Sequence, residues 1–162
     1  MVEKQIYTGI YNYLNDATPL PFDCGKLCGR RCCKGDGGMY LFPGEEVMHK
    51  KTFLNITDSA FTYCGKAVLF AACEGICERE KRPLSCRIFP LFPYLKRGQD
   101  LRIITDPRAY AICPLTSCEP DRHFYKKVKR AILLLMKFEP VREFLYEYTL
   151  LVEEARFGDF FE

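Results

Sequence analysis

The sequence predicts an α+β fold, or a mainly α fold with irregular loops. A small cysteine-rich body packs against an N-terminal helix and a C-terminal helical hairpin. Apolar residues recur at helical spacing at both ends of the chain, whereas all ten cysteines lie in a glycine- and proline-rich middle region. With 162 residues, 48% of them hydrophobic, the chain suits a single domain with a buried core. Within residues 1–162 we assign 20–118 to the cysteine-rich body and 119–158 to the hairpin.

The first predicted element is a helix over residues 3–16. Ile6, Ile10, Tyr13 and Leu14 share one helical face, and the prolines of TPLP end the pattern. The stretch from Asp23 to Gly38, with five glycines and four cysteines, predicts a loop. In residues 39–50 a short extended piece precedes a helix of one or two turns, which opens at PG and carries Glu45 and Glu46 near its start.

The middle of the chain predicts extended segments. Residues 57–70 are rich in β-branched and aromatic side chains and read as one strand, and the following ACEGICEREKRPLSC is rich in turns. Residues 86–95 and 100–105 read as two extended segments around a turn at Gly98. Pro90 and Pro93 restrict the first of them to a sheet edge or to irregular structure.

Two antiparallel helices are predicted at the C-terminal end, over 119–138 and 139–158. Pro140 suits a first helical turn and Gly158 a C-cap. The first helix is basic and the second acidic, so we expect them to complement each other; a basic docking face for an acidic partner is the alternative. Their apolar faces comprise Phe124, Val128, Ala131, Ile132 and Leu135 in the first and Val141, Phe144, Leu145, Tyr148, Leu151, Val152 and Ala155 in the second.

The charge balance and the lack of recognisable targeting signals disfavour several classes of protein. The net charge is +3, from 24 basic and 21 acidic side chains, which disfavours a general nucleic-acid binder. The N-terminal residues resemble neither a signal peptide nor a transit peptide, and no apolar run is long enough to span a membrane. We therefore expect a cytoplasmic protein without a membrane partner, although a protein partner remains open. In that compartment cysteines stay reduced.

The cysteines carry the functional signal. Clustered reduced thiols indicate metal or redox chemistry, and thiolates select zinc, copper(I) or iron–sulfur clusters. Cys24, Cys28 and Cys32 are spaced by four, but eight residues of helix rise about 12 Å, too far for one zinc ion with ligands at about 2.3 Å. We therefore expect this segment to curl as a loop. A metal would then organise the loop-rich body.

Neighbouring cations fit a thiolate site, whose negative charge they would offset. They are Lys26, Arg30, Arg31 and Lys34 around the first cluster, and Arg79, Lys81, Arg82 and Arg87 around the second. The common zinc modules use paired C-x2-C steps or end in two histidines, and this chain has neither pattern. The spacing and the number of thiols lean slightly toward an iron–sulfur cluster over zinc.

CGKLCGRRCC (24–33), followed by CEREKRPLSCRIFP (77–90), resembles the bacterial and archaeal cysteine-cluster family described as zinc- or iron-chelating. The family's pattern is a C-x2-C-x2-CC-type knot with a downstream RP-x2-CR-x-FP motif; the knot here is wider, C-x3-C-x3-CC. Arg82, Pro83, Cys86, Arg87, Phe89 and Pro90 match the second motif position by position. The resemblance implies a metal site formed by Cys24, Cys28, Cys32, Cys33, Cys77 and Cys86.

We extend this set with Cys73, which forms a C-x3-C step with Cys77, and with Cys113, which lies in a stretch (105–115) that resembles a subfamily addition. The predicted metal ligands are therefore Cys24, Cys28, Cys32, Cys33, Cys73, Cys77, Cys86 and Cys113, enough for two four-ligand sites. Cys64 and Cys118 are as readily explained as buried apolar side chains. We expect His49 and His123 not to be ligands, and Asp106 and Arg108 to form a local salt bridge.

Three other functions compete with a metal-binding protein. Flagellin lysine methylases carry a similar cysteine cluster, so a cluster-dependent modification enzyme is an alternative, although the chain shows no cofactor motif. A thiol redox sensor or metal-delivery protein would need an accessible, low-pKa cysteine, for which Cys32 and Cys33 are candidates. A zinc module that binds nucleic acid is disfavoured by the charge balance. Catalytic and cofactor-binding residues cannot be assigned from these motifs.

Overall fold

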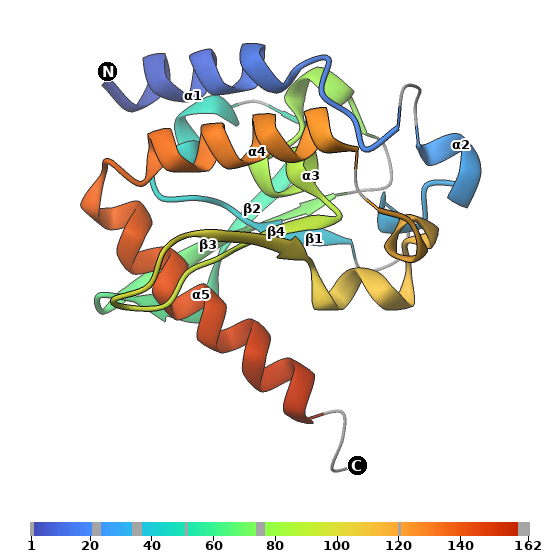
Figure 1. Ribbon diagram of the computed structural model, residues 1–162. Helices are drawn as coiled ribbons and strands as arrows, with labels where there is room; N and C mark the ends of the chain where they lie inside the picture. The colour runs from blue at the N-terminus through green and yellow to red at the C-terminus, as the bar shows by residue number, and fades with distance from the viewer. Residues whose placement is uncertain are drawn as a thin grey trace.

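Helices form both ends of the chain, and two small antiparallel sheets lie between them (Figure 1). The computed structural model describes residues 2–20, 24–33, 37–50, 52–73, 77–119 and 121–158. The α-helices are α1 (Val2–Leu14), α2 (Gly25–Cys28), α3 (Leu84–Ile88), α4 (Arg122–Leu135) and α5 (Glu139–Gly158). The strands are β1 (Gly38–Tyr40), β2 (Leu54–Tyr63), β3 (Lys66–Cys73), β4 (Leu91–Tyr94) and β5 (Arg102–Thr105). This arrangement confirms the predicted α+β class, with helices at both ends.

Short 3₁₀ helices connect these elements. They are η1 (Arg31–Cys33), η2 (Glu45–Met48), η3 (Arg79–Lys81), η4 (Pro107–Ala111) and η5 (Pro114–Ser117). The first sheet has the strand order β1-β3-β2 and the second pairs β4 with β5. Among the described residues, no helix is long and apolar enough to cross a membrane.

The prediction of one strand over 57–70 is wrong, because this stretch turns back on itself. β2 ends at Tyr63, β3 begins at Lys66, and these two residues pair across the turn. The two turn residues, Cys64 and Gly65, have φ of 47° and 72°. Positive φ at both central positions is typical of the two-residue turns that match the twist of a hairpin. Cys64 is exposed there and is not a buried apolar side chain.

The extended segment predicted over 86–95 is also wrong in its first half. Residues 84–88 form α3, which follows Pro83 at its N-cap, and the main-chain N–H of Arg87 donates to the carbonyl of Pro83 at 3.0 Å. The second half is correct: β4 pairs with β5, and the connection turns through Gly98 with φ of 74°. Cys86 therefore lies on a helix and not on a strand.

The C-terminal helices are confirmed, with a difference in their packing. All five residues predicted for the apolar face of α4 are buried, and on the predicted face of α5 Val141, Phe144, Leu145, Tyr148 and Val152 are buried while Ala155 is exposed. The two helices do not lie along each other as the hairpin prediction implies. α4 packs against α1, whereas α5 packs against β2 and β4, and Figure 1 shows the two diverging from their connection.

The ion pairs of these helices also differ from the predicted complementarity between the two, because they are made with other elements. Arg97 and Lys96, which follow β4, pair with Glu143 at 2.6 Å and with Glu153 at 2.9 Å on α5. On α4, Lys127 pairs with Asp16 at 2.8 Å, just beyond α1. Each helix is thus matched in charge by the element on which it packs.

The hydrophobic core joins α1, α4 and α5 to both sheets, and aromatic rings dominate its centre. Tyr148 makes ring contacts with Tyr40, Phe92 and Phe144 at centroid separations of 5.1–5.5 Å. Aromatic pairs at such separations add to the stabilisation from burial. This core lies beside the cysteine-bearing segments and fixes the elements to which they are attached.

Candidate metal centre

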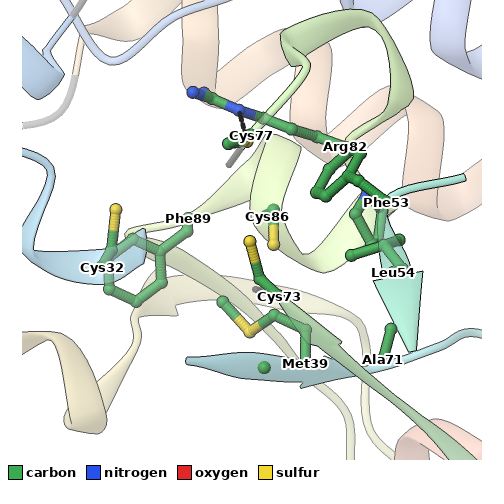
Figure 2. Close-up of a pocket in the computed structure, with 12 residues that line it drawn as sticks. Cys32, Met39, Phe53, Leu54, Ala71, Cys73, Cys77, Arg82, Cys86 and Phe89 are labelled. Atoms are coloured by element: carbon green, nitrogen blue, oxygen red, sulfur yellow. Dashed lines mark hydrogen bonds between the residues drawn. The ribbon is translucent and has the colours of Figure 1, made fainter. Parts of the chain in front are cut away.

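Four predicted cysteines from four separate segments line one cavity, which we call the central thiol cavity. They are Cys32 of η1, Cys73 at the end of β3, Cys77 before η3 and Cys86 of α3. In Figure 2 the side chains of Cys73 and Cys86 point toward each other, with Cys32 to one side and Cys77 beside Arg82. Met39, Phe53, Leu54 and Ala71 make the rest of the lining largely apolar.

A second cavity, the distal thiol cavity, shares Cys32 and Phe89 with the first. Its cysteines are Cys24, Cys28, Cys32 and Cys113, and Cys113 comes from the connection between η4 and η5. Seven of the eight predicted ligands therefore line two cavities that meet at Cys32. The side chain of the eighth, Cys33, lies outside the part of the chain that the structure describes.

The backbone between Cys24 and Cys32 explains how these two residues reach one cavity. α2 ends after a single turn because Gly29 and Arg30 adopt left-handed φ of 60° and 59°. The N–H groups of both residues fold back onto the carbonyl of Gly25. This geometry is typical of a helix C-cap, for which glycine carries no steric cost. The chain thus curls, where a continued helix would have separated Cys24 from Cys32.

Cys86 is held in place by a buried carboxylate on a distant element. Glu45 of η2 is fully buried; its Oε1 accepts from the N–H of Leu84 at 2.5 Å and its Oε2 from that of Phe42 at 2.9 Å. Leu84 is the first residue of α3, so Glu45 satisfies an N–H that the helix cannot satisfy itself. On the same helix, the Ser85 hydroxyl donates to the carbonyl of Tyr40 at 2.9 Å.

Glu45 belongs to a polar cluster that sequence reasoning missed. The Tyr11 hydroxyl lies 2.5 Å from Glu45 Oε1 and 2.9 Å from Nε2 of His49. Burial and the neighbouring carboxylate raise the pKa of Tyr11, which keeps its hydroxyl as a donor. The i,i+4 spacing of Glu45 and His49 was the sequence feature that could have indicated this cluster. Among the described residues, Nδ1 of His49 is buried without a hydrogen-bond partner.

Arginines of the RPLSCRIFP segment contact the thiol region directly. Nε of Arg82 lies 2.9 Å from Sγ of Cys77, where a guanidinium favours the thiolate form. Arg87 donates from Nε to the carbonyl of Arg82 at 2.8 Å and from an Nη to that of Glu80 at 2.5 Å. Its guanidinium also stacks 4.1 Å from the ring centre of Tyr11. Arg87 therefore connects the loop before α3 to the cluster around Glu45.

The predicted Asp106–Arg108 salt bridge is confirmed, and it orients the segment that carries Cys113. Asp106 accepts from the N–H of Arg108 at 2.9 Å and pairs with its guanidinium at 2.6 Å. That guanidinium lies 5.2 Å from the ring centre of Tyr148, in the aromatic core. The N–H of Cys113 then closes the η4 turn onto the carbonyl of Ala109 at 2.7 Å. Burial, with a smaller effect of Cys28, raises the pKa of the Cys113 thiol.

The two cysteines excluded from the predicted set lie outside both thiol cavities. Cys64 is at the β2–β3 turn and Cys118 is exposed beside η5, so neither is the buried apolar side chain that the sequence suggested. His123 lies at the start of α4, away from the lining of both cavities.

The donor set suits a soft metal, but the sulfurs are not closed around one point. Thiolates are the ligands that zinc and iron–sulfur clusters prefer, and no carboxylate of the described residues lines either thiol cavity. Within the described ranges, no group of three or more His, Cys, Asp or Glu side chains is arranged to hold a metal ion. Sulfurs that share one zinc at about 2.3 Å lie about 4 Å from one another. Metal binding would therefore require the thiols to draw inward.

Comparison with known proteins gave no match to a family model, a curated protein or a solved structure.

Proposed function

We propose that this protein binds a metal through cysteine thiolates, as zinc or as an iron–sulfur cluster, with a slight preference for the cluster. The observation that carries the proposal is the convergence of Cys32, Cys73, Cys77 and Cys86 on the central thiol cavity. These residues span more than fifty positions of sequence, and each reaches the cavity from a different element. Reduced thiols belong in a reducing compartment, so we place the protein in the cytoplasm.

The roles of the surrounding residues follow from their contacts. Cys73, Cys77, Cys86 and Cys32 or its neighbour Cys33 would supply the ligands of the central site. Arg82 donates to Sγ of Cys77, a contact that would favour a thiolate there, and Glu45 fixes the start of α3 and thereby Cys86. Cys24, Cys28 and Cys113 would contribute a second site in the distal thiol cavity, completed by whichever of Cys32 and Cys33 the first site does not use. A bound metal would supply folding free energy, or redox chemistry in the case of iron–sulfur.

A thiol redox sensor is the second candidate, favoured by the 2.9 Å contact between Arg82 and Cys77. A guanidinium beside a thiol raises the fraction of reactive thiolate, and Cys73 and Cys86 in the same cavity could act as resolving partners. A cluster-dependent modification enzyme would also need a substrate site next to the thiols.

The test is metal and acid-labile sulfide analysis, with a visible absorption spectrum, on protein purified without oxygen. Stoichiometric iron and sulfide would support a cluster, and zinc alone, lost together with folded structure on chelation, would support a structural site. Cys86→Ser should abolish binding at the central site, whereas Cys64→Ser, which removes a thiol outside both cavities, should retain it. A folded wild-type protein with neither metal would overturn the proposal, and rapid alkylation of Cys77 would then favour the redox sensor.

A further inference from the structure

A third cavity, which we call the arginine cavity, lies between the C-terminal end of α1 and the thiol region. Arg79, Arg82 and Arg87 line it, together with Cys24, Cys32 and Cys86. Asn15 and Thr18, which follow α1, form part of the opposite wall. Among the residues that the structure describes, the lining holds these three guanidiniums and no carboxylate.

Arg87 is the best-placed donor in this cavity. Its side chain is 9% exposed, and the Nε and one Nη are engaged with the main-chain carbonyls of Arg82 and Glu80. Stacking on Tyr11 fixes the plane of the guanidinium. Its other Nη donates no hydrogen bond within the described part of the chain. An oxygen of a ligand could accept a hydrogen bond from this group.

The three charges also act on one another. A cavity lined by charges of one sign attracts the opposite charge, and its walls strengthen that attraction. The partial negative charge at the C-terminal end of α1 opposes it, but this amounts to about half an elementary charge at most.

We propose that the arginine cavity binds the carboxylate or phosphate group of a small anionic molecule, and holds that molecule beside the thiol of Cys86. Planar guanidiniums recognise both oxyanions through paired hydrogen bonds. Cys24, Cys32 and Cys86 line both this cavity and a thiol cavity, so a ligand anchored by the arginines would reach the thiols or a metal bound to them. The anchor itself depends on the arginines and stands without the proposed metal.

The test is isothermal titration of the full-length protein with inorganic phosphate and, separately, with acetate, at constant ionic strength in chloride. Both the metal-free, reduced protein and the metal-loaded protein are titrated. Arg79→Gln is the informative variant, because Arg79 lines the cavity without the buried main-chain bonds of Arg87. Lys81→Gln is the matched control: it removes the same charge from η3, but Lys81 is exposed, pairs with Glu78 and does not line the cavity.

We expect saturable binding of one of the two anions. Arg79→Gln should weaken its affinity about tenfold or more, since that is the contribution of one hydrogen bond between charged groups. Lys81→Gln should change the affinity by less than about twofold, as expected for a solvent-screened charge. The relative affinities of phosphate and acetate identify the oxyanion. Absence of saturable binding in both forms of the protein, or equal weakening by the two variants, would overturn the proposal. Metal content, measured on the same samples, reports separately on the proposed function.

Discussion

In the aromatic core of α5 and the two sheets, Phe144 and Tyr148 are almost completely buried and each contacts several other rings. In the cysteine-bearing region, by contrast, the short helices α2, η3 and η5 bury none of their side chains. Apolar burial contributes about 25 cal/mol per Å², so the core supports its own folding, whereas the short helices gain little from this source. The two regions therefore need different sources of stability, and the metal that we propose would supply one for the second region.

The two regions meet at Glu45. Its carboxylate bonds to the main chain of α3 on the cysteine side and to Tyr11 of α1 on the core side. A buried charge without partners would be strongly unfavourable, but this one accepts several hydrogen bonds. Glu45 therefore transmits the position of the packed core to the helix that carries Cys86.

Phe144→Ala should have the largest effect, because it removes a fully buried ring from the centre of the core. Truncation of such a side chain costs about 3–5 kcal/mol of the free energy of unfolding. Urea unfolding followed by circular dichroism measures it. Because the core positions the cysteine segments, we expect metal binding to weaken as well.

Leu150→Ala is the control for that variant, since Leu150 lies on the same helix but is 49% exposed. It should change the free energy of unfolding by less than about 0.5 kcal/mol. If Phe144→Ala were as mild as this control, α5 would not contribute to the core in the way that its contacts indicate.

Glu45→Gln should have the next largest effect. The amide is nearly isosteric, but its NH₂ group must face a donor, either the N–H of Phe42 or that of Leu84. An unsatisfied buried donor costs about 1–3 kcal/mol. The free energy of unfolding should fall by this amount, and alkylation of Cys86 in the metal-free protein should become faster because α3 loses its anchor.

The matched control is Glu46→Gln on the same 3₁₀ helix, where the side chain is exposed. It removes the same charge and should leave both the stability and the alkylation rate nearly unchanged. Equal effects of the two variants would show that charge, and not the buried hydrogen bonds, accounts for the loss.

Local sequence patterns were enough to predict the helices at both ends of the chain. The buried residues of α4 follow from their spacing, because an amphipathic helix is specified by residues three and four apart. The same holds for the β4–β5 hairpin, in which Gly98 marks the turn. The proposed metal chemistry of the site depends on residue types alone, since clustered cysteines favour soft metals.

The features that could not be predicted from the sequence depend on contacts between residues far apart in the chain. Glu45 looked like an ordinary helix-start acid, and its partner Leu84 is 39 positions away. α3 was missed because residues 86–95 were interpreted as an extended segment that Pro90 and Pro93 restrict to a sheet edge or to irregular structure. Pro83, which precedes α3, is nevertheless compatible with a helix start. The pairing of α4 with α1 depends on the packing of the whole molecule, and no local period encodes it.

Substitution of Cys64 should have the smallest effect on the free energy of unfolding. It tests whether this turn cysteine differs in role from the cysteines that line the thiol cavities. Its φ of 47° is unfavourable for most side chains, whereas asparagine tolerates left-handed backbone. Cys64→Asn should raise the free energy of unfolding by about 0.5 kcal/mol, and Cys64→Val should lower it by at least as much, because β-branched residues disfavour positive φ. Urea unfolding distinguishes the two signs. Metal content should stay at the wild-type value in both variants, since Cys64 is exposed and lines neither thiol cavity. Loss of metal in both, with the fold intact, would mean that the ligand set extends beyond the two cavities and that the proposed division of the cysteines is wrong.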